Sequence, residues 1–319
     1  MSKPASKAAG KSGKQDALTG TIVAAHGRHY LADVDGEFLQ CVTRGKKTNV
    51  AVGDIVHLQR TSDNQAVIEK IAERTTLLYR SDQYKSKLLA ANITRLFIVV
   101  ATEPSFADDL VSRALVACEA AGVEAHLILN KVDVEAPLAR ARERAGLYAS
   151  LGYPLHEVSA RTDPDGAVAT LMPLLEGQSS IFIGQSGMGK SSLINLLVPD
   201  ADIAVREISE ALDTGKHTTT FTRLYRLPAP EGGSGGQIID SPGFQEFGLH
   251  HIEPMQLAHL MPDIAQEATA CRFYNCSHLH EPGCGVIAQV ESATQAGTIS
   301  ASRYRIYGEL FAELSQTRY

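Results

Sequence analysis

The sequence lacks a long apolar segment. Its longest uninterrupted apolar run, residues 96–101, is far too short to cross a bilayer. No hydrophobic signal segment follows the start of the chain, so we expect a cytoplasmic protein that does not contact membranes. With 44% hydrophobic and 21% charged residues among 319, the composition is typical of two or three domains with sizeable cores.

An excess of basic residues is also lacking. The 30 lysines and arginines are outnumbered by 36 acidic residues, and the net charge is −6. Composition therefore gives no indication of nucleic-acid binding, and any RNA contact must come from local basic patches. One such patch is the lysine-bearing tail, residues 1–17, which cannot bury enough apolar surface to fold. This tail is either a solubilising disordered end or a basic arm that touches phosphates.

A phosphate-binding loop is present at residues 184–191. The loop matches the pattern G-x-x-x-x-G-K-[ST] at every fixed position, between an expected strand at 180–183 and an expected helix at 191–197. Backbone N–H groups in such a loop cradle phosphates, Lys190 reaches the β- and γ-phosphates, and the Ser191 hydroxyl ligates Mg²⁺. The candidate nucleotide-binding residues here are Gly184, Gln185, Ser186, Gly187, Met188, Gly189, Lys190, Ser191 and Ser192.

The base specificity is indicated by Asn130, Lys131 and Asp133, which form an N-K-x-D motif after an apolar strand at 125–129. The Asp133 carboxylate can accept hydrogen bonds from the N1–H and 2-amino groups of guanine, whereas adenine would leave it unpaired. A P-loop kinase or ATPase is the competing reading, and this motif argues against it. Ser159 and Ala160 follow a short strand and resemble the loop whose backbone N–H contacts guanine O6.

Two switch segments follow the phosphate loop. A strand at 237–239 leads into a D-x-x-G motif, in which Asp240 would hold Mg²⁺ and the Gly243 N–H would face the γ-phosphate. Residues 215–220 are rich in threonine, and we assign Thr219 to close over Mg²⁺ as the first switch. An ordinary polar loop is the alternative for this segment.

The order of these motifs is permuted, because N-K-x-D and S-A precede the phosphate loop. Permutation is physically permitted since all these loops lie at the carboxyl ends of strands in one sheet. Alternating strands and helices, the latter expected at 106–121, 135–151 and 165–175, predict a mostly parallel sheet. We therefore expect a central α/β domain at 75–249, a circularly permuted P-loop GTPase.

A metal site is predicted after this domain. Four residues with the spacing C-x4-C-x-H-x5-C provide the ligand set of structural, tetrahedral Zn²⁺: Cys271, Cys276, His278 and Cys284. Disulfides or unpaired core cysteines are the alternatives, and core positions are expected for the other two cysteines, Cys41 and Cys118. The C-terminal domain, 250–319, should be a zinc-binding module with helices near 289–297 and 301–314.

The second of these helices carries an apolar stripe that favours packing. Its Arg303 and Arg305, together with Arg318, are candidates for an RNA-facing side.

The N-terminal part, 18–74, reads as short alternating strands at 20–25, 29–34, 37–43, 54–60 and 65–71. Five strands in so short a stretch favour an all-β OB-fold barrel, a common platform for oligonucleotides. A loop cluster of Arg44, Lys46 and Lys47 is its best candidate for phosphate contact. The segment lacks a row of stacking aromatics, so a structural barrel without an RNA role is the alternative.

Together, the permuted GTPase motifs, the preceding small barrel and the cysteine-rich tail resemble the RsgA (YjeQ) family of small-ribosomal-subunit GTPases, from residue 18 to the C-terminus. The resemblance implies a bacterial assembly factor that binds the small (30S) ribosomal subunit and its rRNA with GTP late in maturation. It further implies release after hydrolysis to GDP and phosphate, and we expect a monomer. A GTP switch for protein partners, with the zinc module as adaptor, is the rival reading.

The catalytic machinery is less explicit. The position after D-x-x-G, where many GTPases place a water-orienting glutamine, is Phe244, so unaided hydrolysis should be slow. Lys190 is the catalytic residue that the phosphate loop supplies. Residues 247–251 match the family motif F-G-L-x-H, and the resemblance nominates His251 as the water-orienting group. The preceding His250 leaves open which histidine acts, and an uninvolved surface histidine is the alternative.

Overall fold

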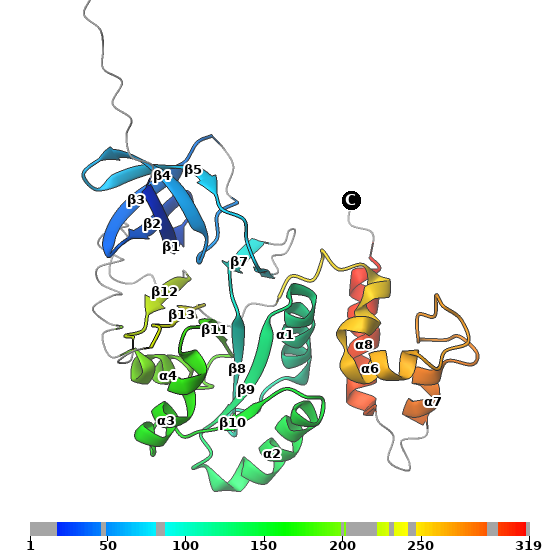
Figure 1. Cartoon of the computed structure of the whole chain (residues 1–319). Coiled ribbons are helices and arrows are strands. Elements are labelled where there is room, and N and C mark those ends of the chain that lie inside the picture. The colour runs from blue at the N-terminus through cyan, green and yellow to red at the C-terminus, as the bar shows by residue number, and fades with distance from the viewer. Residues whose placement is uncertain are drawn as a thin grey trace, which may run out of the picture.

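The computed structural model of the chain describes residues 18–45, 49–80, 87–198, 201, 222–229, 233–241, 247–291 and 299–316. In Figure 1 a small barrel, an α/β domain and a helical module follow one another along the chain, which confirms the predicted fold class. The domain limits given above stay predictions. Several predicted sites lie outside the described residues, namely the tail at 1–17, Lys46, Lys47, Thr219, Gly243, Phe244 and Arg318.

The N-terminal barrel has OB-fold topology. Its sheet order is β1-β2-β3-β5-β4, and β4 returns to pair with β1, so the barrel is closed. Asp35 and Gly36 have φ angles of 53° and 92°, as the tight turn between β2 and β3 requires. Each strand lies within two residues of its predicted limits. The strands are β1 (Leu18–His26), β2 (His29–Val34), β3 (Glu37–Thr43), β4 (Ile55–Ser62) and β5 (Gln65–Ile71).

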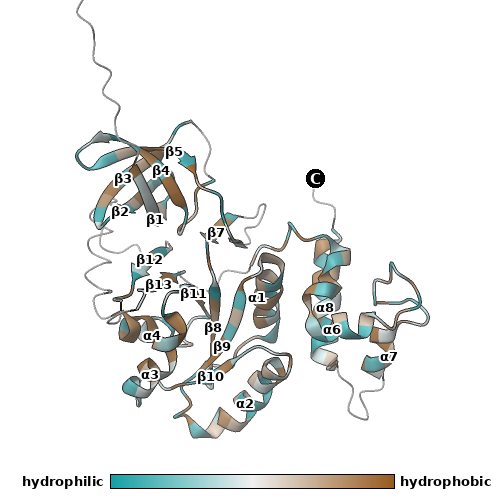
Figure 2. Cartoon of the chain, in the orientation of Figure 1, coloured by the Kyte–Doolittle hydropathy of each residue, from teal (hydrophilic) through white to brown (hydrophobic). Residues whose placement is uncertain are grey.

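The central sheet has the order β10-β9-β8-β11-β13-β12 and is parallel except for β12. Its middle strands are apolar on both faces because helices cover the sheet, as the hydropathy colouring in Figure 2 shows for β8 and α1. The strands are β8 (Arg95–Ala101), β9 (Glu124–Asn130), β10 (Leu155–Glu157), β11 (Ser179–Ile183), β12 (Arg223–Arg226) and β13 (Gln237–Asp240). The helices are α1 (Asp108–Ala121), α2 (Glu135–Ser150), α3 (Pro164–Leu175) and α4 (Lys190–Leu197).

The connection between barrel and central sheet was not predicted. β12 pairs with β1 through Ala24 and Arg223, so the barrel strands and the strands of the α/β domain form one continuous sheet. An ion pair of 2.6 Å between Arg226 and Asp33 crosses the same joint. A separate ribbon of β6 (Leu77–Arg80) and β7 (Lys87–Ala91) lies between the two parts. Pairing of segments so far apart in the chain leaves no local signal in the sequence.

The C-terminal module is helical. It contains the 3₁₀ helix η1 (Pro254–Leu260), α6 (Pro262–Ala268), α7 (Gly285–Glu291) and α8 (Ala301–Leu314). The limits of α8 agree with the prediction, whereas α7 starts four residues before the predicted helix. α8 packs against both η1 and α1. Within the part of the chain that the structure describes, none of the helices has the length and apolarity needed to traverse a bilayer.

Candidate nucleotide pocket and metal centre

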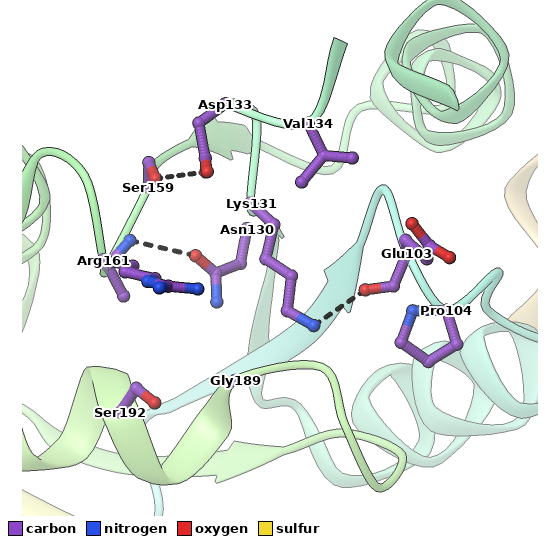
Figure 3. A pocket seen from close by; sticks show the side chains of 11 residues that line it. Glu103, Pro104, Asn130, Lys131, Asp133, Val134, Ser159, Arg161, Gly189 and Ser192 are labelled. Atoms are coloured by element: carbon purple, nitrogen blue, oxygen red, sulfur yellow. Dashed lines mark hydrogen bonds between the residues drawn. The ribbon is translucent and has the colours of Figure 1, made fainter. Parts of the chain in front are cut away.

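A cavity of about 490 Å³ lies where β9 and β10 end (Figure 3). Three segments that are separate in the sequence meet here: the N-K-x-D motif, the S-A loop and the phosphate loop. Strand topology explains the meeting, because the parallel strands before these loops end at the same edge of the sheet. The lining residues are Glu103, Pro104, Asn130, Lys131, Asp133, Val134, Ser159, Ala160, Arg161, Gly189 and Ser192.

Asn130 ties the three segments together. Its side chain is buried, with 1% of its surface exposed. Its Nδ2 donates a hydrogen bond of 3.0 Å to the Met188 carbonyl in the phosphate loop, and its Oδ1 accepts one of 3.2 Å from the Ala160 amide. A buried amide with both ends satisfied is a rigid connector, so Asn130 fixes the spacing between the base-binding and phosphate-binding loops.

Asp133 and Lys131 are held in place by neighbours. The Ser159 hydroxyl donates a hydrogen bond to the Asp133 carboxylate, and the two side chains lie together in Figure 3. The Lys131 ammonium donates to the carbonyls of Gly187, at 2.6 Å, and Glu103, at 2.8 Å. The lysine thus bridges two cavity walls, while the carboxylate of Asp133 is oriented by a hydroxyl donor.

The phosphate loop needs glycine at specific positions. A Cβ at Gly184 would lie 2.6 Å from the Val99 carbonyl oxygen, which excludes any side chain there. Gly189, the N-cap of α4, has φ 88°, a left-handed conformation that favours glycine. At the start of α4 the Lys190 ammonium forms an ion pair with Asp240 at the end of β13. The cation for phosphates and the proposed Mg²⁺ carboxylate are therefore adjacent.

Several lining residues were not singled out from the sequence. Arg161, Glu103, Pro104 and Val134 all border the cavity. The one available signal was the position of Arg161, directly after the Ser159-Ala160 pair. Val134 directly follows the N-K-x-D motif, whereas Glu103 and Pro104 follow β8, a strand that carries no recognisable motif.

His251 lies away from the cavity-lining residues. Its ring packs on Tyr79 of β6, with ring centroids 4.6 Å apart. Partial burial and the neighbouring His250 both lower the pKa of His251, so its neutral form is favoured near neutral pH. A neutral imidazole is able to orient water, but the catalytic role of His251 stays a prediction.

The four predicted metal ligands converge. Their ligand atoms all lie within 4.8 Å of one another. His278 Nδ1 is 3.3 Å from Cys271 Sγ and 3.6 Å from Cys284 Sγ, and these two sulfurs are 3.7 Å apart. Tetrahedral zinc, with bonds of about 2.0–2.3 Å, has ligand–ligand separations of about 3.3–3.8 Å. The donor set and its spacing fit one closed, structural zinc ion, and the disulfide alternative is wrong because all five cysteines are free.

The surroundings of the cluster favour bound thiolates. The amides of Gly285 and Ile287 donate to Cys271 Sγ and Cys284 Sγ at 3.3 and 3.5 Å. Burial raises the pKa of Cys276 to about 12, so its thiolate form requires a nearby cation. Burial also lowers the pKa of His278, which favours the neutral form that ligates metals.

Helix α8 holds the zinc loop through hydrogen bonds from two tyrosines. The hydroxyls of Tyr304 and Tyr307 donate hydrogen bonds of 2.8 Å to the carbonyls of His278 and Ser277, respectively. The predicted packing role of the apolar stripe on α8 is confirmed by its burial. Its tyrosines also hold the zinc loop by hydrogen bonds. Two carbonyls of the ligand loop are therefore fixed by one helix.

The RNA-facing assignment of Arg303 is wrong. The residue is only 6% exposed and forms a bidentate ion pair with Asp263 of α6, at 2.8 and 2.9 Å. A buried carboxylate attracts the guanidinium inward, which a reading based on helical periodicity cannot detect. Arg305 is exposed but pairs with Asp109 and Glu309.

The chain is similar in sequence to known proteins. The family model described as RsgA GTPase matches residues 71–250. The small ribosomal subunit biogenesis GTPase RsgA of Paraburkholderia xenovorans (strain LB400) is 54% identical over 299 residues, 93% of each chain, and that of Ralstonia pickettii (strain 12J) is 52% identical over 300 residues, 94% of each.

Two crystal structures of similar proteins share the whole architecture. YjeQ from Thermotoga maritima superposes with a TM-score of 0.69 at 28% identity and covers 95% of this chain and all of its own. YloQ, described as a circularly permuted GTPase, gives 0.65 at 25% identity and covers 98% and 100%.

Proposed function

This chain belongs to the RsgA GTPase family, and we propose that it hydrolyses GTP during late maturation of the small (30S) ribosomal subunit. It binds the subunit with GTP and leaves after hydrolysis to GDP and phosphate. We propose further that it acts in the cytoplasm as a monomer. The observation that carries the proposal is the cavity in which N-K-x-D, S-A and the phosphate loop meet, in a chain whose close relatives are named for this activity.

The base-binding half of the cavity selects guanine. Asp133, oriented by the Ser159 hydroxyl, accepts the N1–H and 2-amino hydrogen bonds. A backbone N–H of the loop at Ser159 and Ala160 contacts guanine O6, and the Lys131 side chain lies along the base. Arg161, which also lines the cavity, covers the outer edge of the nucleotide. An adenine nucleotide would leave the Asp133 carboxylate desolvated and unpaired, which is the source of the discrimination.

The phosphate-binding half begins at the N-terminus of α4. Backbone amides of residues 184–191 cradle the phosphates, and Lys190 neutralises the β- and γ-phosphate charge. Ser191 and Asp240 would hold Mg²⁺, which supplies further neutralisation of the phosphate oxygens when it is bound. The closeness of Lys190 and Asp240 supports this division of roles, because the cation and the carboxylate then serve neighbouring parts of one triphosphate. Thr219 and Gly243 complete the proposal as the two switch contacts.

Hydrolysis by the protein alone should be slow. Phe244 supplies no water-orienting group, and His251 packs on Tyr79 at 4.6 Å between ring centroids. Uncatalysed small GTPases turn over at roughly 10⁻⁴ to 10⁻³ per second. We propose that subunit binding rearranges the second switch and brings His251 to the attacking water.

The zinc module offers a suitable surface for RNA. Between its first two ligands the loop carries Arg272, Phe273 and Tyr274, and the Tyr274 side chain is fully exposed. The Arg272 guanidinium lies 5.4 Å from the Phe273 ring centroid, and residues 271–280 contain no carboxylate. Exposed aromatic rings and an arginine can stack on unpaired bases of RNA. A surface that binds a partner protein has less need of this combination. This favours an rRNA contact over the protein-adaptor reading.

The test is GTP turnover by the full-length protein with and without purified small subunits. We expect strong stimulation by small subunits and none by large subunits, with GTP preferred over ATP. Lys190→Ala should abolish nucleotide binding and serves as the inactive control. Equal turnover with and without small subunits would contradict the proposed function, and a preference for ATP would instead favour a P-loop ATPase.

A further inference from the structure

Arg113, near the middle of α1, touches two different parts of the molecule. Its Nη1 donates to the Phe247 carbonyl at 3.3 Å and to Glu313 Oε1 of α8 at 3.1 Å, while Nη2 pairs with the second Glu313 oxygen. Phe247 is the first described residue after the D-x-x-G segment, and Glu313 is in the last turn of the zinc-supporting helix. One guanidinium thus connects the exit of the second switch with the C-terminal module.

The switch side of this connection is well defined. Phe247 is 1% exposed and forms an isolated antiparallel β-bridge with Arg80 of β6. The next amide, Gly248, donates to the Tyr79 carbonyl at 3.1 Å. The chain leaving the second switch is therefore held at the edge of β6, and Arg113 contacts its carbonyl from the α1 side.

α1 itself is tied to the phosphate loop. The Ala107 amide, at its N-cap, donates to Gln185 Oε1 at 3.0 Å. One face of the helix is buried against the sheet, including Val111, Leu115 and Cys118. A packed helix of this kind moves as a rigid unit, so its contact with Gln185 and its contacts through Arg113 respond together.

The C-terminal side has one buried anchor and one partly exposed contact. Arg303 pairs with Asp263, with side chains 7% and 2% exposed, and also donates to Ser112 of α1 at 2.9 Å. The Arg113–Glu313 pair is more accessible, at 11% and 27%. Breaking the buried pair leaves uncompensated charge, whereas the more accessible pair exchanges with water at lower cost. The Arg303–Asp263 pair is therefore suited to stay intact, and the Arg113–Glu313 pair is suited to break and re-form.

From this geometry we propose that Arg113 is a positioning residue that couples the zinc module to hydrolysis. The proposal rests on the proposed function. Subunit binding to the zinc loop shifts α8, whose Tyr304 and Tyr307 hold that loop. The shift pivots on Arg303, moves Glu313 and redirects Arg113, which repositions Phe247 and the switch residues before it. Arg113 thus acts on the reaction through Phe247 and does not touch the nucleotide.

The experiment measures GTP turnover by the full-length protein over a range of small-subunit concentrations. We expect Arg113→Met and Glu313→Gln to keep basal turnover, GDP affinity and zinc content. Their maximal stimulation should fall by about 5- to 30-fold, the usual size of such coupling, with little change in the half-saturating subunit concentration. Because both variants act on one connection, the double variant should lose no more than Arg113→Met alone.

Matched variants separate coupling from general destabilisation. Arg305→Ala removes one exposed ion pair between the same two helices, to Asp109, and one within α8, to Glu309, and should leave the stimulated rate unchanged. The charge swap Arg113→Glu with Glu313→Arg restores the ion pair but not the donor to Phe247, so stimulation should stay low. Full rescue by the swap, or full stimulation of Arg113→Met, would overturn this inference and leave the proposed function intact. Absence of stimulation in the unaltered protein would overturn the proposed function and this inference with it.

Discussion

The loops proposed to bind guanine and the zinc loop each depend on a few polar side chains, but they are supported in different ways. Asn130 ends β9, and Lys131 and Asp133 follow it; Leu127, Ile128 and Leu129 of this strand are fully buried. All four zinc ligands lie on an irregular loop between α6 and α7, which Figure 1 shows projecting from the edge of the molecule. A large apolar core supports the first site, whereas the second depends on its metal.

The two sites should therefore tolerate substitutions differently. Removing one polar group from the guanine loops alters recognition while the sheet beneath remains folded. Removing one ligand from the zinc loop takes away the interaction that orders it. The following predictions test this contrast, beginning with the largest expected effect.

Loss of zinc should unfold the zinc loop and α7 and spare the nucleotide pocket. Cys276→Ser or chelation removes binding energy of about 10 kcal/mol that the loop uses to fold. Hydrogen exchange should show lost protection in α7 and at the zinc loop, with GDP affinity largely retained. Cys118→Ala, in the core of α1, is the control and should keep its zinc. Loss of GDP binding together with zinc would show that the two sites are not independent.

Arg303→Met should be the next most severe change. It leaves the Asp263 carboxylate buried without a partner, which costs about 3–5 kcal/mol. Chemical denaturation should report this loss of stability. Adding Asp263→Asn should recover much of it, because no buried charge then remains. A double variant as unstable as Arg303→Met would mean that packing, and not charge, accounts for the effect.

Asp133→Asn should change recognition without changing stability. Two hydrogen bonds to a charged acceptor are lost, about 3 kcal/mol or more, so GDP affinity should fall at least about a hundred-fold. Xanthine nucleotides, which offer an oxygen where guanine has an amine, should bind better than before. Calorimetry measures both affinities, and an unaltered thermal midpoint is the control. Retained preference for GDP over ADP would contradict the assignment of Asp133.

The smallest effect concerns two stacked histidines, His126 and His156, in the neighbouring strands β9 and β10. His126 Nε2 donates to Glu124 at 2.8 Å, so in the neutral ring its Nδ1 accepts from His156 Nε2 at 2.9 Å. Burial lowers the pKa of both histidines, despite the nearby carboxylate of Glu124; the charge of Arg95 acts in the same direction as burial.

Because their folded pKa values lie below the unfolded value of about 6.5, these histidines stabilise the fold above that pH. The stabilisation is lost as pH falls from about 6.5 through the folded pKa values. The melting temperature should drop by about 2–4 °C per kcal/mol lost. His156→Phe should flatten this dependence, whereas the exposed His29→Gln should not, with zinc content checked at each pH. If the melting temperature of His156→Phe depended on pH as in the unaltered protein, the histidine pair would be excluded as the cause of this dependence.

Much of the fold was predictable because its signals are local. Alternating apolar residues predicted all five barrel strands, and the limits of α8 were predicted correctly from an apolar stripe. The cavity residues of the three nucleotide loops were also identified in advance, since each motif carries its own spacing. The β6–β7 ribbon and η1 were missed, because short segments stabilised by distant partners have no periodicity of their own.

The motifs proposed for phosphate and guanine and the set of zinc ligands could be identified from the sequence, because they consist of side chains at fixed spacings. How the parts are joined became visible only in the folded molecule. There β12 pairs with β1, Arg303 turns inward to Asp263 and Arg113 lies between Phe247 and Glu313. Such contacts depend on packing between segments far apart in the chain, where the free energy of burial and charge pairing, and not local pattern, selects the partner.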